Sequence, residues 1–165
     1  YIELLKYFNK DTQNAFFVCP DDLDVEHDKW MNKKVLKLEK ERDEEKIRQV
    51  KENEEHYKEM KGKFLDLFFT DGVVNLHVLQ SVLEFYVEGK TMHHCVFSNN
   101  YYKKPQSLVL SATVAGQKIE TVEFSLESLK VVQSFGACNS RTNYHDQIVA
   151  LVNKNAGYIQ KRLTA

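Results

Sequence analysis

The stretch Leu108–Val114, with the sequence LVLSATV, leads through the pair Ala115-Gly116 into Gln117–Phe124, QKIETVEF. Both segments are rich in β-branched residues, which favour strands, and the Ala-Gly pair between them is typical of a turn. A third strand is predicted over Leu129–Phe135, where it closes at Gly136. Together the three segments predict an antiparallel meander, and this sheet decides the fold class.

Upstream of the meander, the sequence predicts a hairpin. A short aromatic strand, Phe64–Phe69, precedes the turn signal Thr70-Asp71-Gly72, and a second strand follows from Val73 to Leu79. An Asp-Gly pair between two apolar segments is a strong signal for a tight turn. We therefore expect two further strands before the meander.

Helices are predicted on either side of the meander. Ser81-Val82-Leu83-Glu84 matches a capping box and predicts a helix that ends at Gly89. Thr91 is expected to cap a second short helix, and Thr142 or Asn143 a final one. The apolar residues expected on the buried side of that final helix are Ile148, Val149, Leu151, Val152 and Ile159. Helices segregated from an antiparallel sheet define an α+β fold, with the helices packed on the sheet.

A highly charged segment precedes this domain. From residue 21 to 63, 26 of 43 residues are charged, and Pro20 followed by two aspartates is a good helix start. We predict a long helix over residues 24–61, straight or bent, which forms a charged helical arm. Trp30, Met31, Val35 and Leu38 are expected to make one docking stripe, while the middle is solvated. A solvated spacer is favoured, and a partner-binding arm that contacts another protein is the alternative.

The chain is thus expected to have three parts: an N-terminal segment (residues 1–20), the charged arm (21–63) and an α+β domain (64–165). Its net charge of −1 excludes a globally basic nucleic-acid binder. The average nevertheless hides a difference, because residues 1–100 carry a net charge of −5 and residues 101–165 a net charge of +4. A locally basic face therefore remains compatible with the composition.

Several sequence features bear on location. No apolar run approaches the length of a membrane span, so no membrane association is expected. The odd number of cysteines, Cys19, Cys95 and Cys138, without a CxxC pair, argues against a secreted disulfide framework and predicts a cytoplasmic protein. The chain begins with Tyr1 rather than Met, so we expect it to be part of a longer protein.

The densest group of reactive side chains is His93-His94-Cys95. If Thr91 caps a helix, Cys95 lies in its first turn, where backbone amides and the helix dipole favour a nucleophilic thiolate. Neighbouring residues on a helix point about 100° apart, however, so His94 would be a poor base for that thiol. The structural alternative is that Cys95 is a small buried hydrophobic residue. We expect no bound metal and no cofactor, because paired zinc-ligand spacings and phosphate-binding loops are absent.

Two other groups of polar residues lie in the second half of the chain. Glu123, Gln133 and Asn139 occur on or just after the predicted strands, and a buried amide such as that of Gln133 needs hydrogen-bond partners. Tyr101, Tyr102, Lys103, Lys104 and Arg141 make a candidate nucleic-acid surface, in which the tyrosines stack on bases and the cations contact phosphate. Ordinary solubilising surface is the alternative for these cations.

Four short blocks stand out in the second half of the chain: Glu88-Gly89, His94-Cys95-Val96, Thr121-Val122-Glu123 and Gln133-Ser134-Phe135-Gly136-Ala137-Cys138-Asn139. Together they resemble the PcfJ-like family of proteins encoded on conjugative plasmids, phages and other bacterial mobile elements. They occur in the order typical of the family, within residues 76–151. The loop Asn99–Pro105 departs from the pattern, which has a tyrosine and a glycine there. The resemblance implies a bacterial, cytoplasmic protein of a mobile element, and it implies no particular reaction.

Two functions follow as hypotheses. The first is a nucleic-acid or protein interaction module that acts in DNA transfer or processing, favoured because no base for the cysteine is evident and the second half of the chain is basic. The second is an enzyme with a polar pocket built from the residues that recur in the blocks: His94, Cys95, Glu123, Gln133 and Asn139. Such an enzyme would use a cysteine nucleophile for acyl transfer or hydrolysis, or bind a nucleotide-type substrate. The resemblance implies that these five side chains converge in one pocket, whereas in the interaction module the polar residues would brace the fold.

Overall fold

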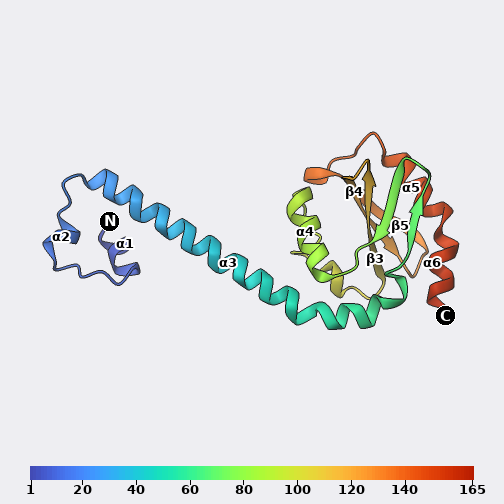
Figure 1. Cartoon of the computed structure of the whole chain (residues 1–165), viewed down its shortest axis with the longest axis horizontal. Helices are drawn as coiled ribbons and strands as arrows, with labels where there is room; N and C mark the ends of the chain where they lie inside the picture. The colour runs from blue at the N-terminus through green and yellow to red at the C-terminus, as the bar shows by residue number, and fades with distance from the viewer. The chain divides into compact units, whose positions relative to one another are not determined.

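The computed structural model describes all 165 residues, and the chain divides into two compact units, Tyr1–Arg48 and Gln49–Ala165. The predicted long helix is confirmed as α3 (Leu23–Lys61), and its residues are shared between the two units (Figure 1). No helix in the chain combines the length and the apolar character needed to cross a bilayer.

The first unit has a small core at the start of α3. Leu4 and Leu5 of α1 (Ile2–Tyr7) pack with Trp30, close to the short helix α2 (Ala15–Val18). The docking stripe is therefore narrower than predicted: Trp30 is buried, whereas the other three members, Met31, Val35 and Leu38, are exposed. The reason is the small size of the unit, whose buried apolar core extends along α3 only as far as Trp30.

The C-terminal turns of α3 belong to the second unit. Val50 and Tyr57 are buried in its core, and the Tyr57 hydroxyl donates to the carbonyl oxygen of Leu79. Lys61 is also buried, and its Nζ donates to three backbone carbonyl oxygens, those of Lys104, Pro105 and Ser107. Burial lowers the pKa of Lys61 to about 8, while the three carbonyl dipoles favour the ammonium form.

Five antiparallel strands form one sheet, in the order β1-β2-β3-β4-β5. Each strand pairs with its neighbours in the sequence, as predicted for the hairpin and the meander. The strands are β1 (Phe68–Thr70), β2 (Val74–Val78), β3 (Ser107–Val114), β4 (Gln117–Ser125) and β5 (Lys130–Phe135). The sheet ends at β1 on one side and at β5 on the other.

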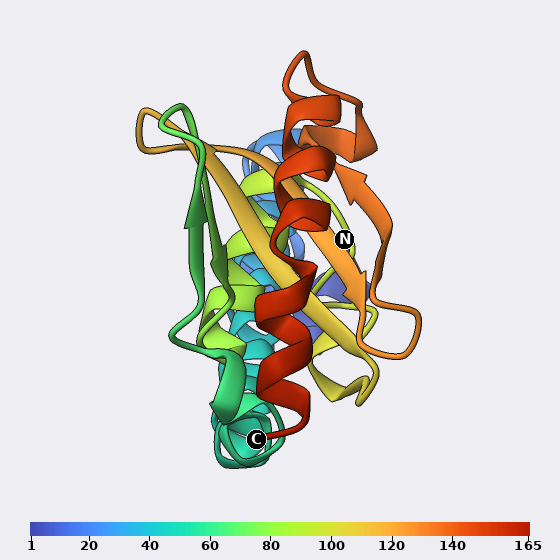
Figure 2. The same ribbon diagram turned by 90° about the vertical axis from the view of Figure 1, so that its right-hand side faces the viewer.

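Helices cover both faces of the sheet, which confirms the α+β class. Leu110, Val122 and Phe124 face α5 (His145–Lys154) and α6 (Ala156–Leu163), whereas Val109 faces α4 (Val82–Met92) and the end of α3. Figure 2 shows α5 and α6 in front of the sheet and α4 behind it. Alternate residues of the central strand β3 therefore point into two different cores, so the strand is apolar along most of its length.

Three predicted helix ends are wrong. The helix that begins at Ser81 is capped as expected, with Ser81 Oγ accepting from the Glu84 amide at 3.1 Å, but it continues past Gly89 to Met92. Thr91 lies inside that helix and caps nothing, and residues 93–100 form turns. The final helix has no side-chain cap from Thr142 or Asn143 and is interrupted at Asn155, which separates α5 from α6.

Candidate functional site

A cavity of about 360 Å³ lies between β5, the neighbouring part of the sheet and the turns that follow α4. The structure brings all five candidate residues to this one cavity. Strand residues, the turn residues 94–99 and Tyr101 supply most of the lining, and Asn139 completes it. The lining residues are His94, Cys95, Val96, Asn99, Tyr101, Val109, Thr121, Glu123, Gln133, Phe135 and Asn139.

The turns over the cavity are held close to α4 by a glycine. A Cβ atom on Gly89 would lie 3.2 Å from the carbonyl oxygen of His94 and 3.6 Å from Cβ of Phe97. The turns are also bounded by two residues with positive φ, His93 at 51° and Asn100 at 55°. Such left-handed residues are uncommon outside glycine and often occur near binding sites. The Glu88-Gly89 block is therefore explained in part by close packing.

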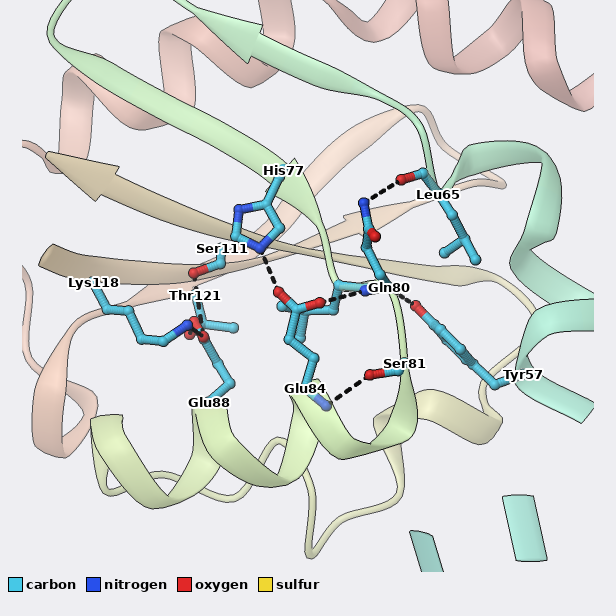
Figure 3. Close-up of polar contacts among 11 residues, drawn as sticks. Tyr57, Leu65, His77, Gln80, Ser81, Glu84, Glu88, Ser111, Lys118 and Thr121 are labelled. Atoms are coloured by element: carbon cyan, nitrogen blue, oxygen red, sulfur yellow. Dashed lines mark hydrogen bonds and ion pairs between the residues drawn. The ribbon is translucent and has the colours of Figure 1, made fainter. Parts of the chain in front are cut away.

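A fully buried carboxylate, Glu88 of α4, is bonded to Thr121, one of the residues that line the cavity (Figure 3). It accepts hydrogen bonds from Ser111 Oγ at 3.2 Å and Thr121 Oγ1 at 2.5 Å, and it pairs with Lys118 Nζ. A buried carboxylate needs such partners, because removing its charge from water is otherwise very unfavourable.

An irregularity in β4 makes this cluster possible. Ala112 pairs with Glu120 and Thr113 pairs with Lys118, so Ile119 is an extra residue on β4. Because side chains alternate along a strand, the bulge brings Lys118 to the same face as Thr121, where it reaches Glu88. Strict alternation would place Ile119 on the same face as Thr121 and Glu123, but because of the bulge it packs in the core on the α5 side.

Thr121 links Glu88 to His94. The Thr121 hydroxyl donates its single hydrogen to Glu88, so it must accept from His94 Nε2, which lies 2.8 Å away. This pattern assigns the Nε2–H tautomer and leaves Nδ1 with a lone pair. Nδ1 is buried and has no hydrogen-bond partner. Burial lowers the pKa of His94, and the Glu88 charge opposes this shift, so the imidazole is neutral near pH 7.

Glu123 and Gln133 form a second polar pair on the cavity. They are directly opposite on β4 and β5, and Gln133 Nε2 donates to Glu123 Oε1 at 3.1 Å. Gln133 Nε2 also donates to the Tyr101 hydroxyl at 2.9 Å, and Ser107 Oγ donates to Glu123 Oε2 at 2.7 Å. The two side chains are therefore held in fixed positions while both remain only half-buried.

Cys95 lies on the cavity but not at a helix N-terminus. The predicted short helix is absent, so the helix-dipole argument for a reactive thiolate no longer applies. The alternative that Cys95 is a buried hydrophobic residue is also wrong, because its side chain is exposed. His94 and Cys95 lie in a bend, so the helical geometry that argued against His94 as a base is absent too.

The candidate nucleic-acid surface is only partly available. Tyr102 is 1% exposed, where it packs on Phe85 and Phe97, so it cannot stack on a base. Lys104 Nζ lies 3.7 Å from the ring centre of Tyr101 and covers one face of that ring. Lys103, Lys104 and Arg141 are exposed.

Sequence reasoning missed a second buried carboxylate, Glu120, on the opposite face of the sheet. Glu120 accepts from Ser134 Oγ at 2.7 Å, from the Thr142 amide at 3.1 Å and from the Thr142 hydroxyl, and it pairs with His145 Nδ1 at 2.7 Å. Burial alone would raise the pKa of Glu120, but the donors from Thr142, Ser134 and His145 outweigh it and hold the pKa below its ordinary value. The signal that the sequence offered for this site is a charged residue, Glu120, beside the apolar residues of β4.

The fold and the cavity define the second unit as an α+β domain with a polar, partly enclosed pocket beside an edge strand. No cluster of three or more His, Cys, Asp or Glu side chains is arranged to hold a metal ion. Residues 1–149 match the PcfJ-like protein family, and the chain belongs to that family. The match includes the long charged helix and the domain as far as residue 149, within α5. The chain matches no curated protein and no solved structure.

Proposed function

We propose that the domain is an enzyme in which Cys95 is the nucleophile and His94 is its base. The observation that carries this proposal is the Glu88–Thr121–His94 chain, which holds a neutral imidazole in one tautomer on the same cavity as an exposed thiol. Enzymes that activate a nucleophile commonly use a base whose second nitrogen is oriented by a further polar group.

The proposed reaction is transfer or hydrolysis of an acyl group. Cys95 Sγ attacks the carbonyl carbon of an amide or ester, and the thiol proton passes to His94 Nδ1. The two atoms share no hydrogen bond in the structure, so this step requires them to approach when the substrate binds. The imidazolium returns this proton to the leaving amine or alcohol as the carbon–nitrogen or carbon–oxygen bond breaks. Water then cleaves the thioester and regenerates the thiol. Glu123, Gln133 and Asn139 supply hydrogen-bonding groups that hold the substrate.

The proposal is tested without knowledge of the substrate by measuring the alkylation of cysteines with iodoacetamide. Cys19 and Cys138 are also exposed and serve as internal controls in the same chain. With peptide mass spectrometry at pH 7, we expect Cys95 to react about tenfold faster than either control, because thiolate character governs the rate.

Two variants identify the source of this reactivity. His94→Gln should remove the advantage of Cys95, and Thr121→Val should reduce it because the tautomer is no longer fixed. Ser134→Ala, on the other face of the sheet, is the matched control and should leave the rate unchanged. If Cys95 reacts no faster than Cys19 and the His94 variant changes nothing, the enzyme proposal is wrong.

The second candidate function is a nucleic-acid interaction module that acts in DNA transfer or processing. It is supported by the exposure of Lys103, Lys104 and Arg141 and by the resemblance to proteins of conjugative plasmids and phages. Fluorescence anisotropy with single- and double-stranded DNA should detect binding that weakens steeply with salt. Lys103→Glu with Lys104→Glu should weaken it, and no binding at low salt would exclude this function.

A further inference from the structure

The last strand of the sheet, β5, has a free edge. It pairs with β4 on one side, and no backbone hydrogen bond joins residues 130–135 to any other segment. Figure 2 shows β5 in orange at the outer side of the sheet, away from the β1–β2 hairpin. Half of the backbone groups of an edge strand point outward, so they are available to pair with another extended chain.

Cavities flank this edge on both faces of the sheet. The cavity that contains His94 and Cys95 lies on the α4 side, and a second cavity of about 810 Å³ lies on the α5 side, lined by β5, α5 and Arg141. Gln133, Phe135 and Asn139 line both. Successive side chains of a bound strand point to opposite faces, so a strand beside β5 would place its side chains alternately toward the two cavities.

The charge of the α5-side cavity indicates the chemistry of the occupant. Lys130 and Arg141 line it and are exposed, and no carboxylate is among its lining residues. The nearest buried carboxylate, Glu120, is already bonded to Ser134, Thr142 and His145. An acidic side chain directed to this face would therefore meet two cations and no repulsive group.

The edge also limits the length of the pairing. Glu123 pairs with Gln133 and Phe124 pairs with Val131, so Val132 is an extra residue that interrupts β5. Bulges of this kind discourage continuous edge pairing. The usable part is thus Gln133–Phe135, the part whose side chains also line the cavities. Only a few main-chain hydrogen bonds can form along these three residues, and together they give weak binding. The acidic side chain is therefore needed for affinity.

We propose that β5 binds an extended acidic peptide as an additional strand, paired along Gln133–Phe135 with an acidic side chain against Lys130 and Arg141. The identification of this peptide as the substrate rests on the proposed function, because its main chain would pass Cys95. The binding itself does not depend on that reaction.

The experiment uses the full chain and a fluorescein-labelled heptapeptide of alternating glutamate and valine, followed by anisotropy at low salt. Three competitor or replacement probes accompany it: the same peptide with alternate amides N-methylated, a lysine–valine peptide and an oligothymidylate. We expect N-methylation to weaken binding by about tenfold or more, because it removes the main-chain donors. The lysine peptide should not bind.

Charge reversal tests the position of the site. Lys130→Glu with Arg141→Glu should weaken binding by about tenfold, as expected for the loss and reversal of two exposed charge contacts. Lys154→Glu with Lys161→Glu changes the net charge equally outside the cavity lining and should leave binding within about twofold. Circular dichroism checks that both variants fold.

The outcomes separate this inference from the proposed enzyme. An unreactive Cys95 together with peptide binding would overturn only the enzyme. Equal affinity for the N-methylated peptide would overturn strand addition, and so would no binding of the acidic peptide. If the oligothymidylate binds more tightly than the acidic peptide and its binding depends on Lys130, the occupant of the β5 edge is nucleic acid rather than a peptide. If the chain dimerises through β5 as its concentration rises, the occupant is a second copy of the chain.

Discussion

The two faces of the sheet each bury one glutamate among hydroxyl groups and a histidine, but the two arrangements differ. On the α5 face, Glu120 contacts His145 directly and binds both the amide and the hydroxyl of Thr142. On the α4 face, Glu88 reaches His94 only through Thr121, and His94 retains an unpaired nitrogen. The direct contacts give Glu120 four hydrogen-bonding partners and join the segment after β5 to the sheet. The relayed contact leaves the buried Nδ1 of His94 without a partner, and this is the nitrogen that acts as the base in the proposed enzyme. We therefore expect one face to contribute stability and the other to carry the proposed chemistry.

The largest effect is expected when Glu120 is removed. Glu120→Ala leaves Ser134, Thr142 and His145 without their shared acceptor inside the protein, which should lower the free energy of unfolding by about 3–5 kcal/mol. Urea denaturation followed by circular dichroism measures this loss. Glu127→Ala, at an exposed glutamate, should change stability by less than about 0.5 kcal/mol. A loss as small as the control would mean that the α5 face does not depend on Glu120.

A smaller effect is expected from two glycines, one at each face. A Cβ on Gly136 would lie 2.6 Å from Thr142 Cγ2 and 3.1 Å from the Ile119 carbonyl oxygen, so Gly136→Ala should destabilise the domain by about 1–3 kcal/mol. Gly89→Ala should instead shift the turn that contains His94, whose carbonyl oxygen is 3.2 Å away, and change Cys95 alkylation more than stability.

Gly157→Ala is the control for both glycine substitutions. It has open space and lies inside α6, so it should be neutral or stabilising by up to about 1 kcal/mol. Thermal unfolding and the alkylation rate are measured on all three variants. If Gly89→Ala and Gly136→Ala affect both readouts equally, the division of roles between the faces fails.

The smallest effect is a difference in pH dependence. Burial lowers the pKa of His94 in the folded state, so the unfolded chain binds the proton first, and this contribution to stability weakens as the pH falls below about 6.5. Glu120 has a lowered carboxyl pKa, so its contribution is present above about pH 4.5 and is lost only in more acidic solution. Urea denaturation from pH 4.5 to 8 should therefore show a slope that His94→Gln removes. A slope that persists in this variant would assign the titration elsewhere.

Much of the fold could be predicted from local patterns. The strands over Leu108–Val114 and Gln117–Phe124 follow from β-branched residues around a turn, and α3 follows from a long run without Gly or Pro. The helix ends were less predictable. Gly89 is typical of a helix end, but it lies inside α4 because a neighbouring turn packs against it. Such a contact depends on a segment that folds back in space.

The candidate site was predictable in its members but not in its connections. His94, Cys95, Glu123, Gln133 and Asn139 were identified through the recurring blocks, and they line one cavity; their catalytic role stays a prediction. The roles of Glu88 and Lys118 were not found, because Lys118 reaches Glu88 only through a one-residue bulge in β4. A pattern that assumes strict alternation along a strand assigns Lys118 to the wrong face.

The sequence by itself determined the elements, because turn signals, β-branched runs and helix-forming residues act on their immediate neighbours. It also determined the segregation of charge into the segment from residue 21 to 63. Only the tertiary structure decided which polar residues meet. Glu88 and Thr121 are 33 positions apart in the chain, and their hydrogen bond requires a helix and a strand to pack at one distance and one register. Hydrogen bonds form only over such short distances, so a local pattern can supply the partners but cannot pair them.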